Sequence, residues 1–307
     1  DIGAHEGGFL RGFLRATSAW HGGVPAFPAE TGPPPVRVFC FEPNPSARTR
    51  LAAECTASNG CTMVPFAVSN EPSAAADFFV PSEASRSELA SLSPLVDIQQ
   101  GDGLGEEGRG PGDEHRGAHR VSPDETAPVR VRVVTLDEVW LSPSNFPEIH
   151  GGSWSSTPSA DPSLAGHEQE RQRESGTAAD IDILKIDVEG FDALVLEGAS
   201  RLLANNRTRP RTILFEYSHA WTVSVDTSKY RLGTTVRLLS DLGYASFLVG
   251  TRELVRIDDT CWDQAFEFWW WSNVVACLDD ESDPERGINL RALESLFAAL
   301  SRSRMNT

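Results

Sequence analysis

The sequence has no long apolar run and no excess of positive charge. Nowhere in its 307 residues do about 18 or more apolar residues follow one another, the length that a membrane-spanning helix requires. Lysine and arginine number 27 against 44 aspartate and glutamate residues, for a formal net charge of −17. Proteins whose main partner is a nucleic acid present basic surfaces to the phosphates. The charge balance therefore argues against such a partner, and the sequence itself shows no membrane span.

Metal-binding cysteine patterns are also lacking. The five cysteines contain no C-x-x-C pair, the spacing that zinc sites commonly use, so we predict no metal site. Cys55 and Cys61 flank a short turn, and a disulfide between them is open as an alternative in an oxidising compartment. Isolated buried thiols are the more common outcome, and we expect that state.

The sequence does not start with methionine. It begins at Asp1, within a glycine turn that a strand is expected to precede. We therefore expect the N-terminus to be truncated, with any signal peptide or anchor lost upstream. Localisation is unknown on these grounds, with the cytoplasm as the default.

The stretch around which the chain is organised covers residues 181–199, IDILKIDVEGFDALVLEGA. Its apolar start, residues 181–186, is typical of a strand buried on both faces of a parallel sheet. Apolar residues then recur at helical spacing from position 191. Asp187 and Glu189 lie between the two elements, where ligands of open α/β sheets bind. The alternative is that these carboxylates only cap the helix.

The first 60 residues repeat the pattern of strand end, turn and helix. Residues 1–7 form a D-x-G-x-x-x-G turn before an amphipathic helix, and residues 36–42 form a strand that ends in Glu42. Asn44 and Pro45 then start another helix. This order is typical of the nucleotide-binding half of a Rossmann-like sheet, in which the terminal acid accepts hydrogen bonds from ribose.

Two segments interrupt the fold, residues 99–128 and 142–179. Both are rich in polar and turn-forming residues, and we expect them to be disordered insertions because they carry too little apolar surface to bury. Between them, residues 131–141 alternate and are expected to pack on the sheet. We therefore predict one domain over residues 1–307.

The C-terminal part adds further strands. Residues 211–217 predict a buried strand that ends near Glu216, with His219 two residues beyond it. Residues 268–278 predict an antiparallel strand near the far edge of the sheet. The tryptophans at its start, 269–271, are expected to pack against the core rather than to form an exposed aromatic site.

Together, these motifs resemble the FkbM family of methyltransferases, a branch of the class I enzymes that use S-adenosylmethionine. The motif at 184–199 is the most diagnostic, whereas the first one alone indicates only the superfamily. Two features depart from the family: His5, where asparagine is more usual, and the insertions. In the family's order, the matching motifs are DIGAHEG (1–7), FEPNP (41–45), PFAVS (65–69), TLDE (135–138), LKIDVEGFDALVLEGA (184–199), LFEYS (214–218) and WSNVVA (271–276).

The resemblance implies an α/β fold with a Rossmann-like, doubly wound, seven-stranded sheet that has one antiparallel strand. It implies methyl transfer from S-adenosyl-L-methionine to a hydroxyl of a sugar, glycan or natural product. Glu42 would hold the ribose, and Ala67 and Val68 would lie near the adenine. The methionine part of the cofactor would meet the first turn, namely Asp1, Gly3, Ala4 and Gly7.

A base is expected to take the proton of the acceptor hydroxyl, because hydroxyls are weak nucleophiles at neutral pH. Asp187 or Glu189 is the first candidate and His219 the third, with Glu216 also a candidate. Lys185 is expected to pair with an acid rather than to react. Two alternatives remain. One is a non-catalytic binding or scaffold module with the same fold. The other is an NAD-dependent oxidoreductase, although the sequence lacks G-x-G-x-x-G spacing and a Tyr-x-x-x-Lys pair.

Overall fold

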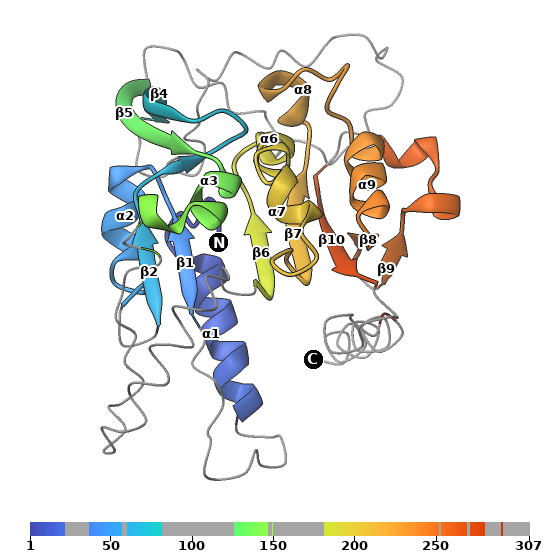
Figure 1. Cartoon of the computed structure of the whole chain (residues 1–307), viewed down its shortest axis with the longest axis horizontal. Helices are drawn as coiled ribbons and strands as arrows, with labels where there is room; N and C mark the ends of the chain where they lie inside the picture. The colour runs from blue at the N-terminus through green and yellow to red at the C-terminus, as the bar shows by residue number, and fades with distance from the viewer. Residues whose placement is uncertain are drawn as a thin grey trace, which may run out of the picture.

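The chain forms a mixed α/β protein (Figure 1). A computed structural model describes residues 1–21, 37–56, 60–81, 126–146, 149, 181–251, 253–268, 271–279 and 290. The predicted α/β class is confirmed. Within these residues, no helix combines the length and apolar character needed to cross a membrane.

Two of the three sheets in the described part of the chain run side by side across the molecule. Their strands follow one another from left to right in Figure 1. In the smaller sheet, β1 and β2 are parallel. In the larger, β6 and β7 are parallel, while β10 runs antiparallel to both of its neighbours. The strands of these two sheets, in spatial order, are β2 (Cys61–Val64) and β1 (Val38–Phe41), then β6 (Ile183–Ile186), β7 (Thr212–Tyr217), β10 (Ser272–Leu278), β8 (Tyr244–Val249) and β9 (Leu254–Arg256).

Ile2 lies between the two sheets. It forms parallel bridges with Phe41 of β1 and Ile186 of β6. Its N–H donates to Lys185 O at 2.8 Å, and its carbonyl accepts from Asp187 N–H at 3.0 Å. The sheets nevertheless have two, five and three strands, so the predicted continuous seven-stranded sheet is not confirmed.

The third sheet shows how residues 131–141, which were expected to pack on the sheet, are divided between a strand and a helix. It has the order β3 (Ala67–Val68), β5 (Thr126–Val134), β4 (Ser73–Pro81). The strand ends at Val134, and the following residues form helix α3 (Leu136–Leu141) rather than more strand. Thr135 and Glu138 make a capping box, in which each side chain accepts from the other's backbone N–H and fixes the start of the helix.

The described ends of the predicted insertions are ordered. Residues 126–128 belong to β5, and the 3-10 turn η5 (Pro143–Asn145) follows α3. Phe146 and Ile149 are buried in the main core, because these apolar side chains fill space beside α3. The rest of both insertions, 99–125 and most of 147–179, lies outside the described residues.

Helices cover the sheets and bury most of their apolar side chains. The main core surrounds Ile2, Phe41, Ile186 and Phe215, where the first two sheets meet. A smaller cluster contains Leu10 and buries the outer side of β1 and β2. The remaining helices are α1 (Gly8–His21), α2 (Pro45–Leu51), α6 (Asp192–Glu197), α7 (Ser200–Ala204), α8 (Trp221–Ser224) and α9 (Leu232–Asp241), with the 3-10 turns η6 (Asp259–Cys261) and η7 (Gln264–Phe266).

Two expectations about side chains are wrong. Cys55 and Cys61 form a disulfide, with Cα atoms 5.0 Å apart, because the turn after α2 returns the chain to the start of β2. Trp271 is 66% exposed instead of packing against the core. It precedes β10, and its indole N–H bonds to Glu216 at the end of β7. Residues 269 and 270 lie outside the described part of the chain.

Candidate functional site

The first turn is fixed to the end of β1 by its own backbone. The N–H groups of Gly3 and Ala4 both donate to Phe41 O, at 3.0 and 3.1 Å, and Gly7 N–H donates to Ala4 O at 2.9 Å. Gly3 and Gly7 have φ values of +74° and +80°, in the left-handed region that favours glycine. The turn therefore brings residues 1–7 against the carboxyl end of β1.

Glu42 joins this turn to the start of α2. One carboxylate oxygen accepts the backbone N–H of His5 at 2.6 Å, and the other accepts that of Asn44 at 2.8 Å. The side chain is buried, and this burial raises the pKa of Glu42 although both backbone hydrogen bonds lower it. His5 thus contributes to this contact through its backbone N–H.

Lys185 connects the turn with the end of β6. Its Nζ lies 3.3 Å from Asp1 Oδ1 and 3.1 Å from Asp187 Oδ2, and donates to Gly3 O at 3.4 Å. The Asp1 side chain is only 1% exposed, whereas that of Asp187 is 39% exposed. The expectation that Lys185 pairs with acids is confirmed. One ammonium group therefore holds together two carboxylates and the glycine turn.

The turn after β6 has an unusual backbone. Glu189 has a φ of +55° and Gly190 a φ of +93°. A Cβ added to Gly190 would lie 2.7 Å from the backbone carbon of Ala220, so this turn packs directly against the segment that leads into α8. Glu189 is partly buried. Contact with the segment after β7 therefore fixes the conformation of the acidic turn.

A second group of acids lies at the end of β7. Glu216 accepts the indole N–H of Trp271 at 2.5 Å, and burial, with the nearby Asp187 carboxylate, raises the pKa of Glu216. Asp192, in the first turn of α6, is fully buried, and its Oδ1 accepts Glu216 N–H at 3.1 Å. Its Oδ2 has no hydrogen-bond partner. Burial raises the pKa of Asp192 to about 7.

Asp192 should make the stability of the protein depend on pH. An unfolded aspartate has a pKa of about 3.9, so the folded state binds this proton more tightly. The free energy of unfolding should therefore fall as pH rises from about 4 to about 7, by an amount on the order of a few kcal/mol, and level off above that. Asp192→Asn keeps an Oδ1 acceptor but cannot titrate, so its free energy of unfolding should not show this decrease. Urea unfolding at pH 5 and pH 8 measures it.

The control for this experiment is Asp77→Asn, which changes an exposed aspartate on β4. Its unfolding free energy should follow that of the wild type at both pH values. If Asp192→Asn shifts stability equally at pH 5 and pH 8, Asp192 does not titrate in this range.

The structure links some of the predicted site residues by hydrogen bonds and ion pairs. Hydrogen bonds and ion pairs link Asp1, Gly3, Ala4, Glu42 and Asp187 around the ends of β1 and β6, and Gly7 closes the same turn.

Three predicted residues make none of these hydrogen bonds or ion pairs. Ala67 and Val68 are buried in β3 of the third sheet. His219 is exposed in the turn after β7, with Nδ1 3.4 Å from Thr222 Oγ1.

Sequence reasoning missed two members of this region. The sequence predicts Trp271 in the core, and its motifs do not single out Asp192. The signal for Asp192 was a charged residue between the apolar positions Phe191 and Ala193.

Comparison with known proteins gave one family match, and it covers part of the candidate site. Residues 170–245 match the family described as the methyltransferase FkbM domain. The matched segment includes β6, the acidic turn and β7. Neither curated proteins nor solved structures gave a match. The family match, over residues 170–245, confirms the resemblance to FkbM methyltransferases that the motifs predicted.

Proposed function

We propose that the chain is an S-adenosylmethionine-dependent O-methyltransferase that acts on a hydroxyl of a sugar, glycan or natural product. The observation that carries the proposal is the junction around Ile2, where the glycine turn, Glu42 and Asp187 meet at the ends of β1 and β6. Ligands of open α/β sheets bind at such ends.

In this proposal, Ile2 joins the first two sheets into one sheet. Ile2 takes the central position between β1 and β6, and β10 supplies the antiparallel strand between β7 and β8. This order supports the seven-stranded sheet that the resemblance implies, with β9 as an added edge strand.

The residues present suit the cofactor. Both carboxylate oxygens of Asp1 are buried without a hydrogen-bond partner, although Oδ1 contacts Lys185, so the group retains acceptor capacity for an ammonium. Each carboxylate oxygen of Glu42 accepts one hydrogen bond from the backbone, and such an oxygen can accept about two, so both can accept another from a ligand. Asp1, Gly3, Ala4 and Gly7 would hold the methionine part and Glu42 the ribose. Ala67 and Val68 would lie near the adenine.

The chemistry divides between cofactor and protein. The cofactor, when bound, supplies a methyl group on a sulfonium, which is already an activated electrophile. The protein's part is to orient the acceptor oxygen and to take its proton. Asp187 is one of the two first-ranked candidate bases: its carboxylate is partly exposed, and Lys185 fixes one of its oxygens. Glu189 stands beside it as an equal candidate, and the exposed His219 ranks third.

Calorimetric titration of S-adenosylmethionine and, separately, NAD tests the cofactor. We expect S-adenosylmethionine to bind and NAD not to bind. Glu42→Gln should weaken binding by roughly 10- to 100-fold, because one charged hydrogen-bond acceptor is replaced by an amide. Glutamine retains one acceptor oxygen, so one of the two backbone hydrogen bonds made by Glu42 is kept, and circular dichroism checks that the fold persists.

Glu253→Gln is the matched control, since Glu253 is exposed between β8 and β9. It should bind S-adenosylmethionine as the wild type does. Absence of binding by folded wild-type protein would refute the proposal and favour a scaffold role, whereas binding of NAD alone would favour an oxidoreductase.

A further inference from the structure

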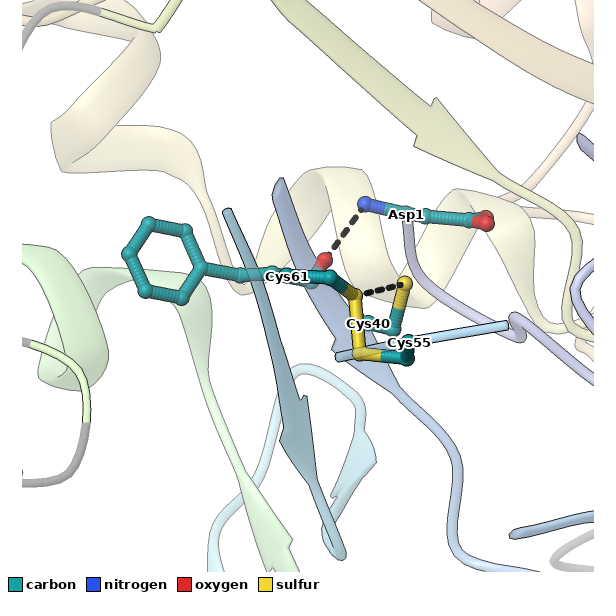
Figure 2. The surroundings of a disulfide bond; sticks show 5 residues. Asp1, Cys40, Cys55 and Cys61 are labelled. Atoms are coloured by element: carbon teal, nitrogen blue, oxygen red, sulfur yellow. Dashed lines mark hydrogen bonds between the residues drawn. A yellow bond between two sulfur atoms is a disulfide. The ribbon is translucent and has the colours of Figure 1, made fainter. Parts of the chain in front are cut away.

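A cluster of three sulfur atoms lies on the side of β1 and β2 away from the main core. We call it the sulfur cluster; it comprises Cys40 of β1, Cys55 after α2 and Cys61 at the start of β2. Cys40 Sγ lies 3.6 Å from Cys61 Sγ, and all three sulfur atoms lie within 4.8 Å of one another. Figure 2 shows the Cys40 thiol pointing at the Cys55–Cys61 disulfide.

The surroundings of the sulfur cluster are apolar. Cys40 and Cys61 are buried and Cys55 is partly buried, and they pack with Leu10 and Leu51 from the flanking helices. Within the described part of the chain, which includes all five cysteines, no histidine or carboxylate joins the three sulfur atoms as a fourth ligand.

Thiolates close together in an apolar setting are ligands for soft metal ions. Cysteine sulfur favours Cu(I) and zinc, but structural zinc almost always takes four protein ligands in tetrahedral geometry. Three sulfurs without a fourth ligand suit Cu(I) better, because this ion accepts three-coordinate sites. We propose that the reduced sulfur cluster binds one Cu(I) ion, and that the Cys55–Cys61 disulfide closes the site.

The two states interconvert by balanced steps. A dithiol reductant gives two electrons and two protons to the Cys55–Cys61 disulfide and is itself oxidised to a disulfide. The bond between the two sulfur atoms breaks, and both cysteines become thiols beside Cys40. Binding of Cu(I) then replaces the thiol protons, which pass to solvent, as for other thiolate metal sites.

Anaerobic titration with Cu(I), buffered by a chromogenic chelator, tests this site in the full chain. Cys261→Ser serves as the background, because Cys261 is exposed and offers an adventitious ligand. The reduced protein should bind one equivalent and show thiolate-to-copper charge-transfer absorption, and the oxidised protein should bind none. Loss of a residue that only hydrogen-bonds to a metal ligand typically weakens metal binding by roughly 10- to 100-fold. Cys40→Ala removes a ligand itself, so it should weaken Cu(I) binding by more than this.

Cys277→Ala is the matched control, because Cys277 is a buried free cysteine on β10 outside the cluster. It should bind Cu(I) as the background does. The proposal is overturned if Cys40→Ala also binds like the background, or if reduced protein that remains folded by circular dichroism binds no Cu(I). Zinc binding with an affinity above that for Cu(I) would likewise overturn the assignment of the ion.

Discussion

The Gly3→Ala variant is expected to lose about 3 kcal/mol or more of unfolding free energy. Gly3 has a φ of +74°, a conformation that costs other residues roughly 1–2 kcal/mol. A Cβ at this position would also lie 1.8 Å from Asp187 O, which is part of the backbone and cannot rotate away. Either the first turn or the end of β6 must therefore move.

That movement would separate the two halves of the candidate site. Gly3 N–H donates to Phe41 O, and Gly3 O accepts from Lys185. Displacement of the turn breaks both contacts and takes Asp1 away from Asp187. We therefore expect cofactor binding, measured by calorimetry, to disappear in Gly3→Ala even at temperatures at which the variant is still folded.

Gly12→Ala provides the control for the loss of a glycine. Gly12 lies in α1, and an added Cβ would meet nothing within 4 Å. Alanine favours helices over glycine by about 1 kcal/mol, so this variant should be as stable as the wild type or more so in urea unfolding. Equal stability of Gly3→Ala and the wild type would contradict the close approach of Gly3 to β6.

Periodicity in the sequence located most of the strands that build the site. Apolar runs that end in Glu42 and Asp187 become β1 and β6, and the parallel arrangement brings both ends to one edge. Such predictions succeed because a buried strand must be apolar and the turn beyond it is free to carry acids.

Contacts between segments that are distant in the chain could not be predicted from the sequence. Cys40 and Cys61 become neighbours only through the register of β1 and β2, in which Val38 pairs with Cys61. The position of Trp271 beside Glu216 likewise depends on the pairing of β10 with β7. Registers of this kind follow from the packing of the whole chain rather than from local pattern.

Residues 131–141 pack as expected, the first part in β5 and the rest against the main core. Their division between strand and helix could also have been predicted. Thr135 followed by Glu138 is the signature of a capping box, which marks the start of a helix. Reading that signature would have divided the segment between β5 and α3.

The second large effect is expected for Lys185→Met, which removes the ammonium but keeps much of the side-chain length. Lys185 is the cation in ion-pair contact with Asp1, whose side chain is 1% exposed. Removing one partner of a buried ion pair typically costs about 3–5 kcal/mol, because the other charge stays buried without compensation. Lys185→Met should lose stability of this order in urea unfolding, and cofactor binding with it.

The double variant Lys185→Met/Asp1→Asn separates lost charge compensation from lost packing. If the buried charge of Asp1 causes the loss, the double variant should be more stable than Lys185→Met, with a coupling free energy of about 1 kcal/mol or more. Arg130→Met, which removes an exposed ion pair with Asp77 on the third sheet, should cost less than about 1 kcal/mol. A Lys185→Met variant no less stable than Arg130→Met would show that Lys185 does not hold the first turn to β6. The junction around Ile2 would then depend on its backbone hydrogen bonds and on the packing of Ile2 in the main core.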